Sequence, residues 1–367
     1  MISTCKIRSL VLMLCFAMAI ALPAHAAEKV RKETRSFAIN PGTEIQIVNK
    51  YGNIHLTNWN KDSVRFEITM TINANKADKV EKIHDGIGFE FTPTSRYVVA
   101  KTVFKSSQGT FIDEMNTLAT TLFTSTNRVQ IDYKVYLPQT SPLVLENKFG
   151  HIFMTDYKSK VDIILSNGDL RAGDFTGNLN LKIDFGSIKI KSTAGSKINA
   201  GYANVEILKS GRMEIESRSS TFELGTVESL ELNSRRDKIR IAEVGSVRSD
   251  LSFTSLRIDN LTGNALFNSN YGDLNLRSVA RGFTGFNLIA RYTEVSLNFQ
   301  KEAAFNLKMA FTRQTSIATP GEFSGLDKKT LDEKAGIYEY SGAFGTGRTL
   351  PAVDINLTAG QISLTRF

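Results

Sequence analysis

The amino-acid sequence predicts an all-β protein: a single-stranded parallel β-helix, or β-solenoid, with 17–18 residues per turn and an α+β insertion near the N-terminus. Three observations predict this fold: a repeat of that length, two rows of apolar residues that alternate with polar ones, and a glycine at the same place in many repeats. A fixed period of this size is typical of solenoids, in which each turn buries its apolar side only by stacking on its neighbours.

The repeat is easiest to read from the glycine, or from the residue in its place, which we call the marker. The eleven markers are Gly52, Gly150, Gly168, Gly186, Ala203, Ser220, Asp237, Thr254, Gly272, Thr293 and Gly360. From 150 to 272, successive markers are 17 or 18 residues apart, and the residues two and four positions after every marker are apolar. Apolar residues two apart, with polar residues between them, indicate a strand with one buried face.

Each repeat should hold one strand before the marker and one after it, with the marker as a corner where glycine supplies unusual backbone angles. The residue before the marker is aromatic in seven repeats, namely Tyr51, Phe149, Phe185, Tyr202, Phe253, Tyr271 and Tyr292. These residues have the parity of the buried rows, so we expect an aromatic stack that points into the core. An outward aromatic strip that binds carbohydrate is the alternative interpretation.

Residues 1–26 have the features of a secretory signal peptide. Lys6 and Arg8 form a basic start, Leu10 to Leu22 is apolar, and Ala24-His25-Ala26 is a small-x-small cleavage site. The apolar stretch is too short to span a bilayer of roughly 30 Å. We therefore expect an exported protein of the bacterial periplasm or cell surface that is not an integral membrane protein.

The cysteines and the charge set limits on the chemistry. Both cysteines, Cys5 and Cys15, lie in the predicted leader, so the exported chain should have neither a disulfide nor a reactive thiol. The net charge is +8, of which Lys6 and Arg8 in the leader supply two. This mild excess permits attraction to anionic glycans or lipid head groups, and it also fits solubility alone.

The interruptions of the period divide the rest of the chain. We expect the first solenoid turn or turns at 27–60, an α+β insertion or cap at 61–140, the solenoid core at 141–319, a surface-loop insertion at 320–350 and the final turn at 351–367. Within the insertion, a helix is predicted near Lys76 to Asp85, capped by Asn75 and ended by Gly86. Residues 105–127 fit either a loop or an amphipathic helix.

Three copies of the corner are alike: Asn49–Leu56, Asn147–Met154 and Ser269–Leu276. The order asparagine, lysine, aromatic, glycine and then Ile-x-Leu, after a signal peptide, resembles a large family of bacterial envelope proteins. These are provisionally named adhesins with β-strand repeats and are largely classed as domains of unknown function. The resemblance covers Ile45 to Trp59, Pro138 to Phe299 and Val353 to Phe367. It implies a β-helix at the cell envelope and carries over no catalytic residues.

Two pairs of carboxylates stand at equivalent positions of adjacent repeats, where neighbouring strands are about 4.8 Å apart. They are Glu206 with Glu223 and Asp273 with Glu294. Paired carboxylates at about this spacing occur in retaining glycosidases. The other interpretation is a surface ladder of ion pairs with neighbouring basic residues. Since nothing in the sequence suggests a cleft, we expect no catalysis.

The remaining motifs exclude several classes of function. The histidines outside the leader are His55, His84 and His151. His55 and His151 fall on outward rows at different offsets, without a nearby acid or cysteine at ligand spacing, so no metal site is expected. The sequence has no glycine-rich phosphate loop, no order of residues typical of a catalytic triad and no nucleic-acid motif. We therefore expect no cofactor and no nucleic-acid partner.

One local departure suggests a binding site. Ser219 and Arg236 interrupt the aromatic row in adjacent repeats. The basic residues around them are Arg218, Arg235, Lys238 and Arg240. Because an unpartnered buried arginine is costly, this corner should open outward and form a basic patch for an acidic glycan or a lipopolysaccharide phosphate. A solvated face with a weakly packed corner is the alternative.

The sequence thus predicts a non-enzymatic, adhesin-like binding module or scaffold of the cell envelope. Its partner would be an anionic glycan, lipopolysaccharide or an envelope protein, and its oligomeric state stays open. The alternatives are a polysaccharide-active enzyme that uses an exposed carboxylate pair, and a structural subunit that assembles through its ends.

Overall fold

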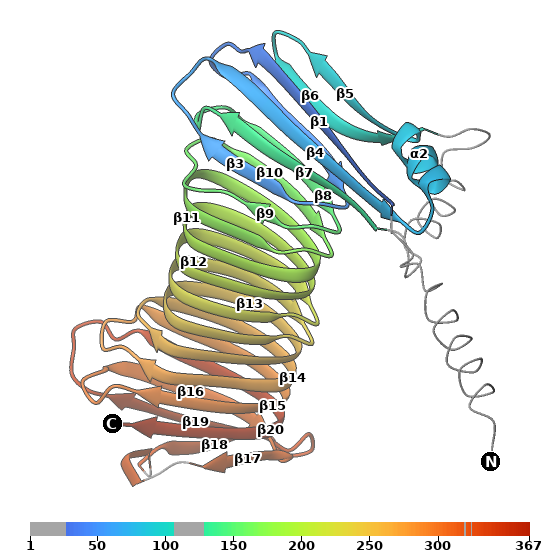
Figure 1. Ribbon diagram of the computed structural model, residues 1–367. Helices are drawn as coiled ribbons and strands as arrows, with labels where there is room; N and C mark the ends of the chain where they lie inside the picture. Colours follow the sequence, from blue (N-terminus) through green and yellow to red (C-terminus); the bar gives the residue numbers. More distant parts are fainter. Residues whose placement is uncertain (1–26, 106–127, 319–320, 324) are drawn as a thin grey trace, which may run out of the picture. The chain divides into compact units, whose positions relative to one another are not determined.

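The structure is a computed structural model that describes residues 27–105, 128–318, 321–323 and 325–367. In this part of the chain, the strands form one 20-stranded sheet, and the single α-helix is α2 (Ala77–Asp85) (Figure 1). The fold is therefore all-β, as predicted. The predicted signal peptide at 1–26 and the ambiguous segment at 106–127 lie outside the described residues.

The chain divides into two compact units. The first falls within Met1–Lys32, Thr69–Phe89 and Val103–Gln130, and the second comprises Glu33–Ile68, Glu90–Thr102 and Ile131–Phe367. Besides α2, the first unit takes parts of five strands: β1 (Ala27–Ala38), β4 (Ser63–Ala74), β5 (Ile87–Pro93), β6 (Tyr97–Phe104) and β7 (Arg128–Leu137).

Helix α2 confirms the predicted helix and corrects its cap. The residue at its N-cap is Lys76 rather than Asn75, and no side chain caps the first turn. Gly86 ends the helix, as expected, and donates its N–H to the Lys82 carbonyl. Val80 and Ile83 form the buried side of α2. The helix thus depends on this apolar face rather than on a cap.

The second unit begins with short parallel strands. They are β2 (Glu44–Lys50), β3 (Ile54–Asn58), β8 (Leu143–Lys148), β9 (Ile152–Phe153) and β10 (Val161–Ser166). Strand β2 pairs with β8 on one side and with Tyr97–Lys101 of β6 on the other, both in parallel. The predicted α+β insertion therefore also supplies strands to the same parallel sheet, which its sequence did not indicate because it has no markers.

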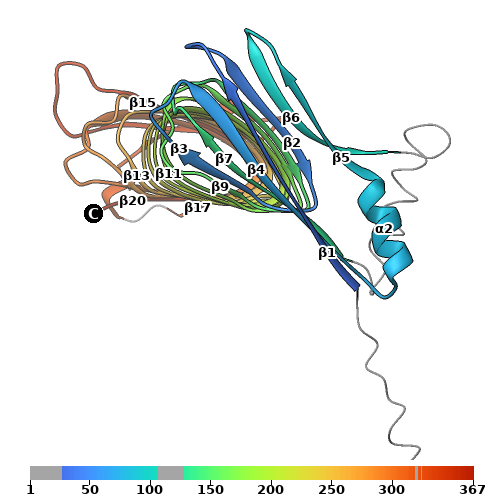
Figure 2. The ribbon, with the colours of Figure 1, turned by 45° about the horizontal axis from the view of Figure 1, so that its top comes forward.

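The repeats stack in register. They lie in β11 (Leu170–Arg218), β12 (Thr221–Arg235), β13 (Lys238–Leu261), β14 (Asn264–Val279), β15 (Gly285–Phe299) and β20 (Ala352–Arg366). Asn204 pairs with Thr221 and Thr221 with Lys238, one repeat apart each time, and all these pairings are parallel. Successive repeats lie side by side in Figure 1 and follow nearly the same path in Figure 2.

The two apolar rows form the core of this stack. Every residue two positions after a marker is buried, and so is every residue four positions after it except Ala172. In-register stacking places each apolar side chain against its equivalents in the repeats before and after. A single repeat could not bury these residues alone, so neighbouring repeats stabilise one another.

The segment expected to be a surface loop at 320–350 contains paired strands instead. The last elements are β16 (Phe305–Thr312), β17 (Thr315–Ala318), η2 (Gly321–Phe323), β18 (Asp327–Asp332) and β19 (Ile337–Phe344). Strand β19 pairs antiparallel with both β16 and β18. All six residues of β18 are exposed, and four of them are charged. Charges on an outer strand oppose pairing with another sheet edge.

Candidate functional site

The residue before each marker has an unusual backbone conformation in all eleven repeats. Its φ angle lies between 50° and 67°, in the left-handed region, at Tyr51, Phe149, Asn167, Phe185, Tyr202, Ser219, Arg236, Phe253, Tyr271, Tyr292 and Ala359. We call this row of residues the corner ladder. Among the marker glycines only Gly272 and Gly360 have positive φ. The expectation that the marker itself holds the unusual angles is therefore wrong for most repeats.

The left-handed residue changes which side chains face the core. In the repeat of Phe253, Leu251 and Thr254 are both buried, whereas Phe253 itself is 53% exposed. Two successive residues before the marker thus face outward, as in a β-bulge, and the alternation resumes one residue out of step. The predicted inward aromatic stack is wrong: six of the seven rings are 42–53% exposed, and only Tyr51, at 4%, is buried.

Glycine at the marker has a different cause, which is close approach between repeats. A Cβ on Gly168 would lie 1.9 Å from the Gly150 carbonyl oxygen, and a Cβ on Gly186 would lie 1.8 Å from that of Gly168. Since the obstacle is backbone held in the parallel sheet, these markers have no room for a side chain.

The exposed rings stack on one another along the repeats. Phe185 and Tyr202 have ring centroids 5.0 Å apart and planes within 2°. Tyr271 lies 5.0 Å from Phe253 on one side and 5.0 Å from Tyr292 on the other, again nearly parallel. These rings cover one another's faces, so the ladder presents mainly their edges to the solvent.

Two arginines lie between the pair Phe185–Tyr202 and the group formed by Phe253, Tyr271 and Tyr292. The guanidinium carbon of Arg218 lies 5.5 Å from the centre of the Tyr202 ring, and that of Arg236 lies 5.9 Å from the centre of the Phe253 ring. Each arginine is therefore placed for a cation–π interaction with the last ring of its group. Arg236 is exposed because the whole ladder faces outward, so the corner does not need to open as the sequence suggested.

Basic residues follow the ladder in the adjacent row, two positions before the marker. This row contains five basic residues, Lys50, Lys148, Arg218, Arg235 and Arg291, and one acidic residue, Asp184. Lys50 and Lys148 lie over the rings of Tyr51 and Phe149, at 4.7 and 5.8 Å. Burial, followed by the charge of Lys148, lowers the pKa of Lys50. The corner thus concentrates positive charge beside aromatic edges.

The four residues of the predicted basic patch are all exposed, but they do not form one cluster. Arg218 and Arg235 lie directly beside each other, in register on neighbouring strands. Lys238 lies past the marker, where it pairs in register with Thr221. Arg240 belongs to the following strand segment, and its Nη2 donates to Asp259 Oδ2 at 3.0 Å.

A buried polar cluster lies inside the corner at these arginines. The Asp237 carboxylate, in a marker position, accepts hydrogen bonds at 2.6 Å from the hydroxyls of Ser217 and Ser234. It also accepts from the backbone N–H groups of Ser220 at 2.7 Å and Arg235 at 3.2 Å. The carboxylate is thus tied to both strands that carry the arginines.

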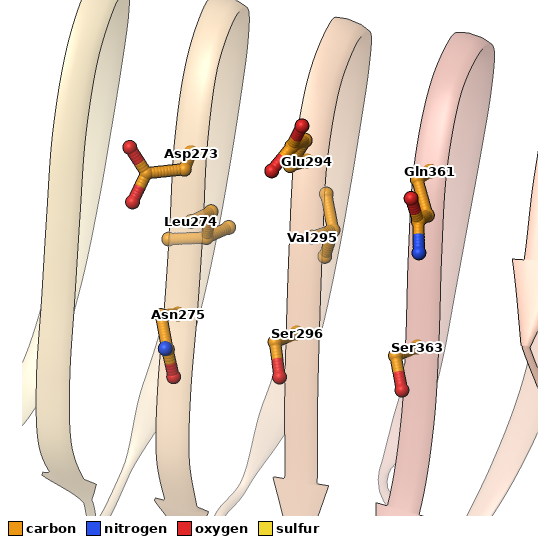
Figure 3. A pocket seen from close by; sticks show the side chains of 8 residues that line it. All are labelled: Asp273, Leu274, Asn275, Glu294, Val295, Ser296, Gln361 and Ser363. Carbon is orange, nitrogen blue, oxygen red and sulfur yellow. The ribbon is translucent and has the colours of Figure 1, made fainter.

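Both carboxylate pairs are in register, in different surroundings. Glu206 pairs with Glu223 across the strands and forms an ion pair with Lys189 at 2.6 Å, which agrees with the ion-ladder interpretation. Asp273 pairs in register with Glu294 and accepts a hydrogen bond from Ser255. This second pair lines a shallow, open hollow of about 300 Å³. Figure 3 shows its polar side chains in two rows: Asp273, Glu294 and Gln361, then Asn275, Ser296 and Ser363.

The histidines show one possible ligand group. Within the described ranges, the one set of three side chains with mutual ligand distances is Glu81, His84 and Asp85 on α2. His84 Nδ1 lies 3.0 Å from Asp85 Oδ1, and this contact, before other causes, lowers the pKa of Asp85. His55 stacks on Phe153 at 4.7 Å. His55 therefore packs against an aromatic ring and is not part of the ligand group on α2.

Comparison with known proteins gives distant similarities only. No family model matches the chain, and no curated protein matches it. Solved structures similar to it include a provisionally named cell adhesion protein from Clostridium sporogenes (8% identity, 92% of this chain and 100% of that chain, TM-score 0.19). Another is a provisionally named adhesin from Bacteroides fragilis (11% identity, 92% and 97%, TM-score 0.24). A third, from Parabacteroides distasonis, is provisionally named a lipid binding protein (13% identity, 91% and 96%, TM-score 0.31).

Two of these three solved structures have adhesion names. In the part of the chain that the structure describes, no helix has the length and apolar character needed to cross a membrane.

Proposed function

We propose that this chain is an exported β-solenoid of the bacterial envelope that binds extended anionic glycans along its corner ladder without catalysing a reaction. The in-register parallel repeats support the solenoid, and the leader-like residues 1–26 support export. The observation that carries the proposed function is the outward row of stacked rings at left-handed positions.

The choice of residues in this row supports a binding role. A left-handed backbone costs an ordinary residue about 1–2 kcal/mol, and glycine or asparagine adopts it most readily. The chain has a typical left-handed residue, Asn167, in only one of the eleven positions and has aromatic residues in seven. Exposed rings gain little from burial here. Their placement is best explained by what they contact from outside, since exposed aromatic rows commonly mark binding surfaces.

The charge beside the ladder determines the class of ligand. The row before the ladder carries five basic residues and one acidic residue, and Arg236 adds a further cation within the ladder. Positive charge along an extended surface attracts extended polyanions, and the attraction weakens as salt screens it. An acidic polysaccharide provides both the negative charge and the length to contact several repeats at once.

The experiment uses protein recovered after secretion from an expressing bacterium, with its mass measured to test cleavage after Ala26. The protein is titrated with acidic and neutral bacterial glycans at low and physiological salt. Binding restricted to acidic glycans and weakened by salt supports the proposal. A variant in which Tyr271 and Tyr292 are both changed to Asn should bind at least tenfold more weakly. Leu208→Asn, which removes an exposed apolar side chain outside the ladder, is the matched control. Equal binding by all three proteins would refute the proposal.

A second candidate is glycan hydrolysis at Asp273 and Glu294, which the hollow beside them favours. Mass spectrometry of the glycans after incubation tests it. If the glycans are cleaved and Glu294→Gln abolishes the cleavage, the protein is an enzyme rather than a binding module. The third possibility, self-assembly through the ends, is less well supported because β18 is charged and exposed. A concentration-dependent size in solution would favour self-assembly.

A further inference from the structure

We propose that Arg218, Arg235 and Arg236 form an oxyanion site where the aromatic row of the corner ladder is interrupted, and that this site takes a carboxylate or phosphate group of the bound glycan. The inference rests on the proposed function, because it names the chemical group that the same surface recognises.

The geometry of the ladder places the two stacked arginines together. Tyr202 and Phe253 are three repeats apart, which corresponds to about 14 Å at about 4.8 Å per repeat. The guanidinium of Arg218 lies over Tyr202 and that of Arg236 lies over Phe253, so the two groups occupy the space that two missing rings leave. A guanidinium placed over a ring keeps its in-plane N–H donors, which match the oxygens of a carboxylate or phosphate.

Among the described residues, none of the three guanidiniums forms a salt bridge with a carboxylate, whereas the nearby arginine Arg240 is paired with Asp259. In the adjacent row the one acidic residue is Asp184. Its Oδ1 and the Nε of Arg218 would lie 2.6 and 3.7 Å from a Cβ on Gly201, so this carboxylate offsets part of the charge of Arg218 without forming a salt bridge. Neighbouring guanidiniums repel one another, and a bound oxyanion with several acceptor oxygens would remove that repulsion.

The residue between the arginines in the ladder leaves this site accessible. Ser219 occupies the ladder position that precedes Arg236, with φ of 50°, and its small side chain replaces a ring. A ring there would stack on Tyr202 in the place that the Arg218 guanidinium occupies. The serine also adds a hydroxyl that can donate to or accept from a ligand oxygen. The interruption of the aromatic row is therefore the expected point for the charged group.

The test compares two double variants with the same change in net charge. Arg218→Ser with Arg236→Ser removes both stacked arginines, and Arg212→Ser with Arg248→Ser removes two exposed arginines elsewhere in the same stack. With oligogalacturonate as a carboxylate probe at low salt, the first variant should bind at least tenfold more weakly and the second should change by less than about twofold. Equal losses in both variants, or no loss in the first, would overturn the proposal.

Two further measurements identify the anion and separate this inference from the proposed function. Lipopolysaccharide and its dephosphorylated form distinguish phosphate from carboxylate as the source. If wild type binds the phosphorylated form more strongly and the first variant binds both forms equally, the bound group is phosphate. Inorganic phosphate, compared with chloride at equal ionic strength, should raise the melting temperature of wild type but not of the first variant. This response supports the site even where no glycan binds, in which case only the proposed function fails. Equal phosphate responses in both proteins would overturn the site.

Discussion

Tyr271 gives the sharpest test of whether the corner ladder serves binding or stability. Its ring stacks on Phe253 and on Tyr292, each at 5.0 Å, while the residue has φ of 55° and is 46% exposed. Tyr271→Asn removes both stacking contacts and places in the left-handed position a residue that tolerates it. The variant therefore separates the ring from the turn that the ring occupies.

The expected change in stability is small because the terms oppose one another. Two stacked pairs contribute about 0.5–1.5 kcal/mol each, so their loss costs about 1–3 kcal/mol. Relief of the left-handed strain returns about 1 kcal/mol. The half-exposed ring also loses some burial, worth about 1 kcal/mol over a few tens of Å². We expect a net loss of about 1–3 kcal/mol in the free energy of unfolding.

Leu274, three residues further on, is the matched control. It is completely buried, and Leu274→Ala should cost about 2–5 kcal/mol by leaving a cavity in the core. Urea unfolding followed by far-UV circular dichroism measures both changes. Under folded conditions we expect Leu274→Ala to retain glycan binding and Tyr271→Asn to lose at least tenfold. The reasoning is refuted if Tyr271→Asn is the more destabilised variant and binds glycan normally, because the ladder would then be a structural device.

Three other predictions follow from the corner and the core. Gly168→Ala should destabilise the fold by about 3 kcal/mol, because its Cβ would lie 1.9 Å from a backbone oxygen. In the control Gly282→Ala the Cβ would meet nothing within 4 Å, so stability should change by less than about 1 kcal/mol. The urea midpoints of the two variants measure the difference. Asp237→Ala should lower the free energy of unfolding by at least about 3 kcal/mol, since several buried donors lose their acceptor. Asp237→Asn should cost less. If the two variants have the same urea midpoint as wild type, the carboxylate does not have this role. Burial raises the pKa of Tyr51 to about 12, so the unfolded chain ionises this tyrosine first, near pH 10, and the folded state loses stability between about pH 10 and 12. Tyr51→Phe should flatten that decline by up to about 1.4 kcal/mol per pH unit, measured as unfolding free energy against pH.

The sequence could predict the repeats because each one makes the same demand on the chain. The apolar rows after the markers repeat eleven times, and the structure buries all of them except Ala172. The hairpin of β18 and β19 could not be predicted in this way. The six residues of β18 are all exposed, so its sequence shows no alternation between buried and exposed positions. Antiparallel pairing there depends on backbone hydrogen bonds, which leave no pattern of apolar residues.

The predicted direction of the aromatic row was wrong because of one backbone angle in each repeat. Counting by twos from the buried strand assumes extended backbone throughout, and a single left-handed residue shifts that count by one. Three residues in the row already conflicted with a buried position, because Asn167, Ser219 and Arg236 would have been polar groups in the core. The correct signal was therefore present as an exception, whereas the parity of the seven rings favoured the inward direction.

The candidate site was predicted in part, and the difference again follows from neighbouring repeats. Arg218 and Arg235 lie side by side because they occupy equivalent positions one repeat apart. Arg240 was placed with them because it is close in sequence, but Asp259 of the next repeat engages it. In a stack of repeats, equivalent positions are a better guide to contact than nearness along the chain.

The interior of the corner helps to explain how three arginines can stand together outside it. The markers are polar at Ser220 and Asp237, in the same two repeats where the ladder has Ser219 and Arg236 in place of rings. Asp237 places a carboxylate, held by four hydrogen bonds, directly inside these repeats. A negative charge at this position attracts the guanidiniums and offsets part of their mutual repulsion while no ligand is bound. The change inside the core and the change on the surface thus occur in the same repeats, and the buried carboxylate allows the guanidiniums to stand together before an anion binds.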